Sequence, residues 1–326
     1  MPTPILFKPE NSKLRCLACH HKCLIAEGKR GICGVRENQQ GELKLLVHSK
    51  VVAKHIDPIE KKPLYHFLPG TEIFSIGTVG CNFRCLNCQN WGISQERGIL
   101  GTPLSPEQAA QEASPYPSLA YTYNEPTIFL EYAKDIAKLT PNKKHVFVTN
   151  GYFSDEALKA MDFVDALNID LKSFNPQFYL KNCGAKLQPV LDNVKKCKAL
   201  GKWVEITTLL IPGENDSEEE LREIAGFLAS IDKEMPWHIS GFHPDFKMQD
   251  KHSTSFASLK RAHDIGKEAG LAYVYLGNVL NEEYSNTCCP QCKRVLIRRK
   301  GYNVKVEGLV NGKCKYCGKE IKGVWG

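Results

Sequence analysis

The stretch that decides the fold is IFSIGTVGCNFRCLNCQN, at residues 73–90. It joins a short apolar run, 73–76, to Cys81, Cys85 and Cys88, which form a C-x3-C-x2-C pattern. Structural zinc normally takes four protein ligands, and an ordinary [4Fe-4S] cluster takes four thiolates. Three closely spaced thiolates with no fourth cysteine nearby therefore indicate a cluster in which one iron keeps an open position for a chelating small molecule. The alternatives are a zinc site completed by a distant ligand and core thiols without a metal.

Downstream of this stretch, short apolar or β-branched runs alternate with helical patterns. The runs lie at 119–123, 145–149, 166–171, 203–210, 238–242 and 272–276. Ser105-Pro106-Glu107-Gln108 is typical of a capped helix start, and Ser217 with Glu220 repeats the pattern. Strands that alternate with helices predict a parallel sheet. We expect an α/β fold, a partial parallel (β/α)6-type TIM barrel.

The composition is that of an ordinary globular protein. The chain has 326 residues, of which 42% are hydrophobic and 24% charged, with a net charge of +7. The charge-free stretch 113–124 is shorter than the roughly 18–20 apolar residues of a membrane span. The apolar run 5–7 is shorter than the core of a secretory signal, which needs about 7–15 residues. We therefore expect a cytoplasmic protein with no membrane partner.

Fourteen cysteines point to metal chemistry, because thiols in a reducing compartment rarely form disulfides. A quartet near the C-terminus has the spacing of a zinc ribbon. A second quartet near the N-terminus lacks the ferredoxin run, which favours zinc, with His20 or His21 as a further ligand; an iron–sulfur cluster is the alternative. The quartets are Cys289, Cys292, Cys314 and Cys317, and Cys16, Cys19, Cys23 and Cys33. We expect domains at 1–70, 71–283 and 284–326.

The sequence GCNFRCLNCQN at 80–90 resembles the radical S-adenosylmethionine (SAM) superfamily, and most of all its glycyl-radical-enzyme activases. The N-terminal quartet, the segments 57–70, 121–127, 209–216 and 275–278, and the ribbon together look like the AmmeMemoRadiSam-type radical SAM proteins. The resemblance implies a [4Fe-4S] cluster on Cys81, Cys85 and Cys88. It also implies reductive cleavage of SAM to a 5′-deoxyadenosyl radical that abstracts hydrogen.

Polar residues follow several of the expected strands, and the C-terminal ends of parallel strands converge on one mouth. By resemblance, these residues and one in the cysteine motif would contact SAM. They are Asn87, Asn124, Glu125, Thr149, Asn150, Asp170, Lys172 and His243. Ordinary turns, solvated charges and hydrogen-bonded side chains are the alternative reading of each.

The resemblance gives some of these residues separate roles. Glu125 would accept the SAM ammonium, because a carboxylate is a strong acceptor for that group. Asp170 would hold the ribose or peptide region, and Lys172 would pair with the SAM carboxylate. Lys172 and His243 are the candidate catalytic residues. Asn87 departs from the family, which usually places an aromatic residue there against the adenine.

These observations predict a radical SAM enzyme that acts on a protein, as an activase does. A nucleic acid or a small metabolite is the alternative substrate, favoured by the positive charge and the ribbon. A non-enzymatic zinc scaffold is the third hypothesis. Expected partners are a reductant such as flavodoxin or ferredoxin and, by resemblance, AMMECR-type and Memo-type proteins.

Overall fold

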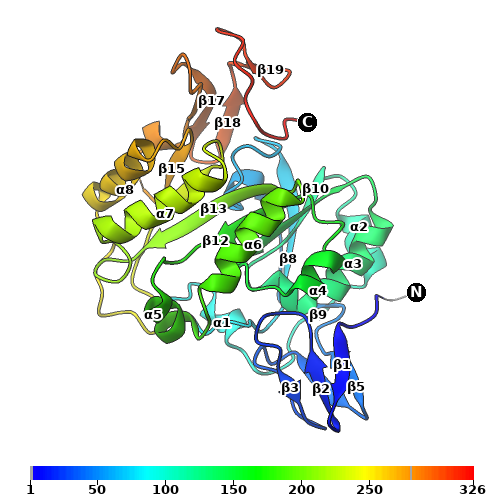
Figure 1. The fold of residues 1–326 in the computed structure, drawn as a ribbon. Coiled ribbons are helices and arrows are strands. Elements are labelled where there is room, and N and C mark those ends of the chain that lie inside the picture. The colour runs from blue at the N-terminus through cyan, green and yellow to red at the C-terminus, as the bar shows by residue number, and fades with distance from the viewer. Residues whose placement is uncertain (1–2, 280) are drawn as a thin grey trace.

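The centre of the molecule is an eight-stranded sheet, seen in a computed structural model that describes residues 3–279 and 281–326. Its strand order is β15-β14-β13-β12-β11-β10-β8-β7 (Figure 1). The strands are β7 (Ala53–Pro58), β8 (Glu72–Gly77), β10 (Ser118–Tyr121), β11 (Lys144–Thr149), β12 (Ala166–Asp170), β13 (Trp203–Leu210), β14 (Trp237–Gly241) and β15 (Val274–Gly277). All neighbouring pairs are parallel except β7 with β8.

This sheet confirms the α/β fold with a parallel core. Each of the seven apolar runs found in the sequence forms a strand. The sheet is open, with β7 and β15 at its edges, and it has one parallel strand more than a six-unit barrel. The edge strand β7 comes from the predicted N-terminal segment 1–70, so that segment contributes to the central sheet.

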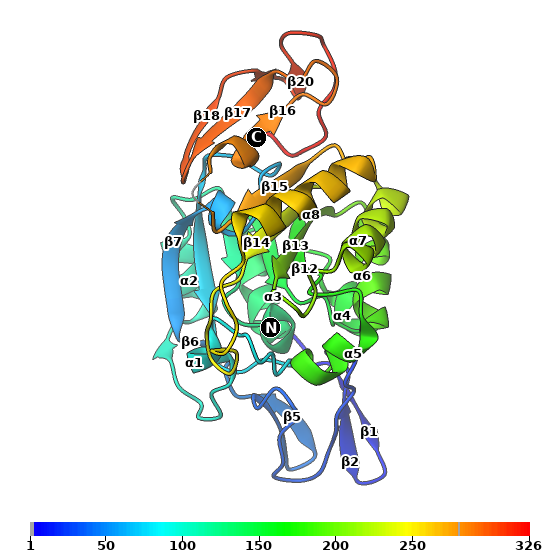
Figure 2. The ribbon, with the colours of Figure 1, turned by 90° about the vertical axis from the view of Figure 1, so that its left-hand side faces the viewer.

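Helices cover one face of the sheet (Figures 1 and 2). The longer ones are α2 (Pro106–Glu112), α3 (Leu130–Leu139), α4 (Asp155–Ala160), α6 (Gln188–Ala199), α7 (Glu218–Ile231) and α8 (Phe256–Glu268). Ser105 and Ser217 cap α2 and α7 as predicted, each by accepting a backbone hydrogen bond. None of the described helices combines the length and the apolar composition needed to cross a bilayer.

Shorter elements complete the sheet region. They are α1 (Trp91–Ser94), α5 (Pro176–Phe178), the π-helical turn Tyr179–Cys183, the 3-10 turns Ile59–Lys61, Pro126–Phe129 and Glu283–Ser285, and the strand pair β6 (Lys50–Val51) and β9 (Thr102–Pro103). The helix α1 and the π-helical turn both lie close to the C-terminal ends of the parallel strands (Figure 1).

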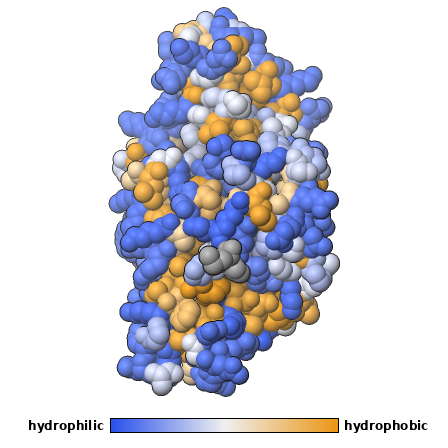
Figure 3. All heavy atoms as spheres, turned by 90° about the vertical axis from the view of Figure 1, so that its right-hand side faces the viewer, coloured by the Kyte–Doolittle hydropathy of each residue, from blue (hydrophilic) through white to orange (hydrophobic). Residues whose placement is uncertain are grey.

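An N-terminal module, residues 3–48, lies at this same end of the sheet (Figure 1). Its strands are β1 (Phe7–Glu10), β2 (Lys13–Cys16), β3 (Leu24–Ile25), β4 (Arg36–Gln39) and β5 (Glu42–Leu45). The backbone N–H of Ser154 donates to the carbonyl of Ala18, and Cys19 pairs with Phe153. Hydrophobic side chains gather in the lower part of the face in Figure 3, where the module meets the sheet.

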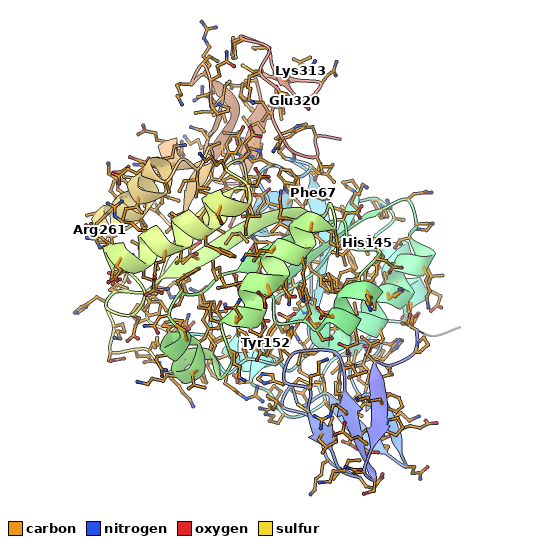
Figure 4. All side chains as sticks on the ribbon, in the orientation of Figure 1. Phe67, His145, Tyr152, Arg261, Lys313 and Glu320 are labelled. Carbon is orange, nitrogen blue, oxygen red and sulfur yellow. The ribbon has the colours of Figure 1, made fainter. Side chains whose placement is uncertain are left out.

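The C-terminal ribbon, residues 284–326, lies at the opposite end of the sheet (Figures 1 and 2). Its strands are β16 (Thr287–Cys288), β17 (Val295–Lys300), β18 (Asn303–Val306), β19 (Leu309–Val310) and β20 (Lys313–Cys314). Arg299 is fully buried, and its guanidinium lies 4.0 Å from the ring centroid of Tyr65. Phe67 pairs with Val324 at the same junction; Figure 4 labels Phe67 there, and Lys313 and Glu320 within the ribbon.

The segment 59–70, which follows β7, fills the N-terminal end of the sheet beneath the ribbon. The backbone N–H groups of Tyr65 and His66 donate to the carboxylate of Glu205 at 2.9 and 2.8 Å. His66 is fully buried, with Nε2 2.6 Å from the hydroxyl of Tyr275 and Nδ1 3.0 Å from the carbonyl of Lys322. Burial lowers the pKa of His66 to about 4, because the charged imidazolium loses its hydration there.

We expect His66 to make the fold acid-sensitive. The unfolded chain binds a proton at the ordinary pKa of 6.5, whereas the folded chain binds it only near 4. Stability should therefore fall as the pH drops from about 6.5 to about 4, by about 3 kcal/mol from this group. Urea denaturation at several pH values measures the effect, and His66→Gln should remove this part of the slope. His252→Gln, at an exposed position, is the control and should keep the pH dependence of the wild-type chain. If the stability of His66→Gln fell with pH as steeply as that of His252→Gln, the assignment to His66 would be wrong.

Candidate functional site

The cysteine loop, residues 78–90, leaves the C-terminal end of β8. Two of its three cysteines are buried and the third is half-buried. The backbone N–H of Phe83 donates to Sγ of Cys81 at 3.4 Å, and the hydroxyl of Ser94 lies 3.1 Å from Sγ of Cys88. Hydrogen bonds to thiolate sulfur stabilise and tune iron–sulfur clusters. The donor set therefore fits a cluster held by three thiolates.

Two asparagines at neighbouring strand ends hold this loop in place. Asn124, which follows β10, donates from Nδ2 to the carbonyl of Gly80 at 2.9 Å and to the hydroxyl of Thr78 at 3.0 Å. Asn150, which follows β11, donates from Nδ2 to Oδ1 of Asn82 at 2.7 Å. The structure therefore gives both side-chain amides a positioning role toward the cysteine loop.

Glu125 lies beside the first cysteine of the loop, and its carboxylate is buried. It accepts hydrogen bonds from the backbone N–H groups of Thr127 at 3.0 Å and Asn150 at 2.8 Å, and from the hydroxyl of Thr149 at 2.8 Å. Burial raises the pKa of Glu125, while these donors oppose the rise. Burial raises the pKa of Cys81 as well, and the nearby charge of Glu125 adds to that effect. A carboxylate held in this way suits an ammonium ligand.

The π-helical turn Tyr179–Cys183 holds the other half of the cysteine loop. The backbone N–H of Arg84 donates to the carbonyl of Cys183 at 2.9 Å. The side chain of Asn182 donates to Oδ1 of Asn87 at 2.9 Å. Asn87, the predicted adenine contact, is thus buried and oriented by a second amide. Turns of this kind often occur at functional sites in proteins.

Cys183 lies in the site although it is one of the three cysteines outside the expected metal-binding sets. It is fully buried, and its hydrogen bond to Cys85 lowers the pKa of Cys85 against the effect of burial. The same hydrogen bond, with burial, raises the pKa of Cys183. The available signal was its place in the segment after β12, because the ends of these strands form the site.

Asp170 and Lys172, predicted SAM contacts, form an ion pair at the end of β12. Lys172 Nζ lies 2.9 Å from Oδ2 of Asp170. Burial opposes the charge on Lys172, but Asp170 and the thiols of Cys85 and Cys183 outweigh it and raise the pKa of Lys172 well above its ordinary value. The lysine therefore supplies a permanent positive charge beside the cysteines, which suits a carboxylate ligand.

His243 lies at the exposed rim of the site. Its Nε2 is 3.0 Å from Nε2 of Gln89, the residue after Cys88. Next to it, the half-exposed Trp91 stacks on Phe246 with ring centroids 5.3 Å apart and an interplanar angle of 13°. The hydrogen bond to Gln89 connects His243 to the cysteine loop.

The predicted site residues thus fall into groups around one loop. Glu125, Thr149 and Asn150 form a network on the Cys81 side. Asp170 and Lys172 form an ion pair on the Cys85 side. The arrangement places a carboxylate and an ammonium group on either side of a thiol-rich loop. These two charges are opposite to those of a ligand that carries both an amine and a carboxylate.

The N-terminal quartet lines one enclosed cavity. Its four cysteines share the walls of this cavity with His21, Arg36, Asn82 and four apolar or glycine residues. Nε2 of His21 lies 2.8 Å from the carbonyl of Asn82 and therefore donates a hydrogen bond to it. Burial raises the pKa of all four thiols.

The C-terminal quartet forms a compact group of sulfurs. The Sγ atoms of Cys289, Cys292, Cys314 and Cys317 all lie within 4.8 Å of one another. Both the Cys289–Cys317 and the Cys292–Cys314 distances are 3.6 Å. The quartet therefore has room for one metal ion at its centre, and Cys288 lies outside it.

The cysteine loop lies within the part of the chain that matches a known family model. A family model of the radical SAM superfamily matches residues 75–225. An uncharacterized protein of Methanocaldococcus jannaschii is 44% identical over 323 residues, covering 96% of each chain. The pyruvate formate-lyase-activating enzyme of Staphylococcus aureus is 22% identical over 191 residues, covering 51% of this chain and 74% of that one.

Two solved structures share the fold, each with a TM-score of 0.50. One is SuiB of Streptococcus suis bound to S-adenosylmethionine, which is 12% identical and covers 68% of this chain and 53% of that one. The other is a radical SAM methyltransferase from Sphaerobacter thermophilus, which is 14% identical and covers 64% of this chain and 67% of that one.

Proposed function

Because the chain belongs to the radical SAM superfamily, we propose that it is an enzyme that cleaves SAM reductively and abstracts hydrogen from a protein substrate. Cys81, Cys85 and Cys88 would hold the [4Fe-4S] cluster. When bound, the cluster and SAM together supply a 5′-deoxyadenosyl radical. This proposal rests on one observation: residues that follow three other strands hold the cysteine loop in place through hydrogen bonds.

The chain's own residues would bind and orient the amino-acid part of SAM. Glu125 would accept hydrogen bonds from the ammonium, and Lys172 would pair with the carboxylate. Asp170 already orients Lys172. Thr149 and Asn150 keep Glu125 aimed into the site through their hydrogen bonds to its two oxygens. Holding the reacting groups in one geometry is the main contribution that a protein makes to cofactor chemistry.

Exposed apolar side chains next to the cysteine loop support a protein as the substrate. Trp91 is 46% exposed, and Ile32, whose carbonyl accepts a hydrogen bond from Arg84 of this loop, is 42% exposed. Trp91 follows the cysteine loop directly. Exposed apolar side chains of this size suit contact with a polypeptide. The likeness to a pyruvate formate-lyase-activating enzyme supports the same activase-like reaction, and the narrower likeness to AmmeMemoRadiSam-type proteins stays a proposal.

The test follows the abstracted hydrogen atom. The anaerobically reconstituted enzyme, given dithionite and SAM, should form methionine and 5′-deoxyadenosine. With a co-encoded candidate protein labelled with α-deuterated glycine, deuterium should enter 5′-deoxyadenosine, and electron paramagnetic resonance (EPR) should show a radical on that protein. Iron-loaded enzyme that forms no 5′-deoxyadenosine would refute the reaction. Deuterium transfer from labelled RNA or a metabolite instead would assign the alternative substrate.

The ribbon would hold zinc in this proposal. A tetrahedral zinc site with Zn–S bonds of about 2.3 Å places its sulfurs about 3.8 Å apart. The Cys289–Cys317 and Cys292–Cys314 distances of 3.6 Å are close to this value. Since the ribbon lies at the other end of the sheet from the cysteine loop, its metal would stabilise the small domain rather than take part in the reaction.

A further inference from the structure

The N-terminal quartet differs from the C-terminal quartet in the spacing of its sulfurs. In the C-terminal quartet, all four Sγ atoms lie within 4.8 Å of one another. The four cysteines of the N-terminal quartet line one cavity, but their Sγ atoms do not all lie within 4.8 Å of one another. A single zinc ion needs sulfurs about 3.8 Å apart. The sulfurs of the N-terminal quartet are therefore spaced more widely than those of a single-ion site.

The cysteine loop provides an internal comparison for this spacing. The sulfurs of Cys81, Cys85 and Cys88 likewise do not all lie within 4.8 Å of one another. These are the cysteines to which the superfamily assigns a cubane cluster. The N-terminal quartet thus resembles the cysteine loop in lacking the close spacing that the ribbon has.

The surroundings of the N-terminal cavity place a cation and a backbone donor beside the thiols. The buried guanidinium of Arg36, which pairs with Glu131, lines the cavity and interacts with the thiols of Cys16 and Cys33. The backbone N–H of Ile32 donates to Sγ of Cys23 at 3.4 Å. Hydrogen bonds and local charge of this kind tune the potential of iron–sulfur clusters.

The four thiols are enough to make a set of four ligands without histidine. His20 is not among the residues that line the cavity, and its ring packs edge-on against Tyr152 with centroids 5.6 Å apart. His21 lines the cavity and donates from Nε2 to the carbonyl of Asn82, which leaves Nδ1 as its ligand atom. The four thiols match the four thiolates of an ordinary [4Fe-4S] cluster.

The cavity and the cysteine loop share a wall. Asn82, the residue after Cys81, lines the N-terminal cavity. Gly80, the residue before Cys81, lies so close to Cys33 that a Cβ there would be 2.5 Å from the Cys33 carbonyl oxygen. Tyr152, labelled in Figure 4, contacts both sides of the wall, with its ring 4.9 Å from that of His21 and 5.3 Å from that of Phe83.

We propose that Cys16, Cys19, Cys23 and Cys33 hold a second [4Fe-4S] cluster, directly beside the cluster of the cysteine loop. Four thiolates leave no open iron, so this cluster would not bind SAM. It would carry electrons, and this role rests on the proposed function. One electron enters from a reduced flavodoxin or ferredoxin, and the same electron leaves for the cluster at Cys81, Cys85 and Cys88, with no atom transferred.

Metal and sulfide analysis of the full chain tests the site without reference to activity. Reconstituted anaerobically, the wild-type chain should contain about eight irons, about eight sulfides and one zinc. The triple variant Cys81→Ala/Cys85→Ala/Cys88→Ala should keep about four of each of iron and sulfide. Adding Cys19→Ala and Cys23→Ala to the triple variant should remove the remaining iron and sulfide. Adding Cys197→Ala, which removes a buried thiol on α6, should leave them in place.

EPR of the dithionite-reduced proteins distinguishes the two sites. The spectrum of the triple variant should not change when SAM is added, whereas the spectrum of Cys19→Ala/Cys23→Ala should change. A wild-type chain with about four irons and two zincs would overturn the proposal, as would a triple variant without iron. Iron that remains in the triple variant supports the N-terminal cluster even if the enzyme does not cleave SAM.

The electron-carrying role has its own measurement. In Cys19→Ala/Cys23→Ala, SAM cleavage driven by reduced flavodoxin should be lost, while cleavage driven by dithionite should remain. Dithionite is a small reductant that reaches the cluster of the cysteine loop directly. Equal losses with both reductants, or none with either, would refute the electron-carrying role.

Discussion

Cys85→Ala is expected to abolish SAM cleavage and to remove the cluster of the cysteine loop. Changes to residues that merely support a metal ligand typically cost 10–100-fold in metal affinity or activity, so loss of a ligand should cost more than about 100-fold. The thiol of Cys85 is buried beside Lys172 and Cys183. Iron content and the rate of 5′-deoxyadenosine formation in the reconstituted variant measure the effect.

Cys183→Ala is the matched control for this prediction. It removes a buried thiol from the same place, because Cys183 and Cys85 form a hydrogen bond. We expect it to keep the cluster, since the π-helical turn holds the cysteine loop through its backbone and through Asn182. Loss of iron in Cys183→Ala with retention in Cys85→Ala would show that the cluster has a different set of ligands.

Arg36→Met is expected to lower the free energy of unfolding by about 3–5 kcal/mol, because it leaves the charge of Glu131 buried without a partner. Both side chains are 1% exposed. Arg36 donates to Oε1 of Glu131 at 2.9 Å and to the carbonyl of Ile128 at 3.0 Å. This pair joins the N-terminal module to α3. Urea denaturation of equally metallated samples measures the loss.

Two controls separate burial from charge in this experiment. Arg30→Met breaks a more exposed pair with Glu37 and should change stability by less than about 1 kcal/mol. Arg36→Met/Glu131→Met removes both buried charges and should recover most of the loss. If Arg36→Met cost no more than Arg30→Met, the buried pair would not stabilise the junction.

Local patterns in the sequence predicted much of this molecule correctly. The seven apolar runs form the parallel strands, and Ser105 and Ser217 cap their helices, because strand formation and capping depend on residues close together in the chain. The spacing of Cys289, Cys292, Cys314 and Cys317 predicted a metal site for the same reason, since each pair lies on one short turn.

Contacts between distant segments had no such local signal. Nothing near Cys183 marks it as a neighbour of Cys85; their contact arises because the turn after β12 lies against the loop after β8. The segment 59–70 reads as a loop, and only the folded chain places Tyr65 and His66 on the carboxylate of Glu205.

The sequence by itself determined which residues are thiols, where strands and helices begin, and which superfamily the cysteine motif belongs to. The tertiary structure alone decided that the N-terminal cavity shares a wall with the cysteine loop and that the ribbon lies at the far end. Spacing along the chain constrains neighbours only within a turn or a strand. The distance between two remote cysteine sets depends instead on how the whole sheet packs.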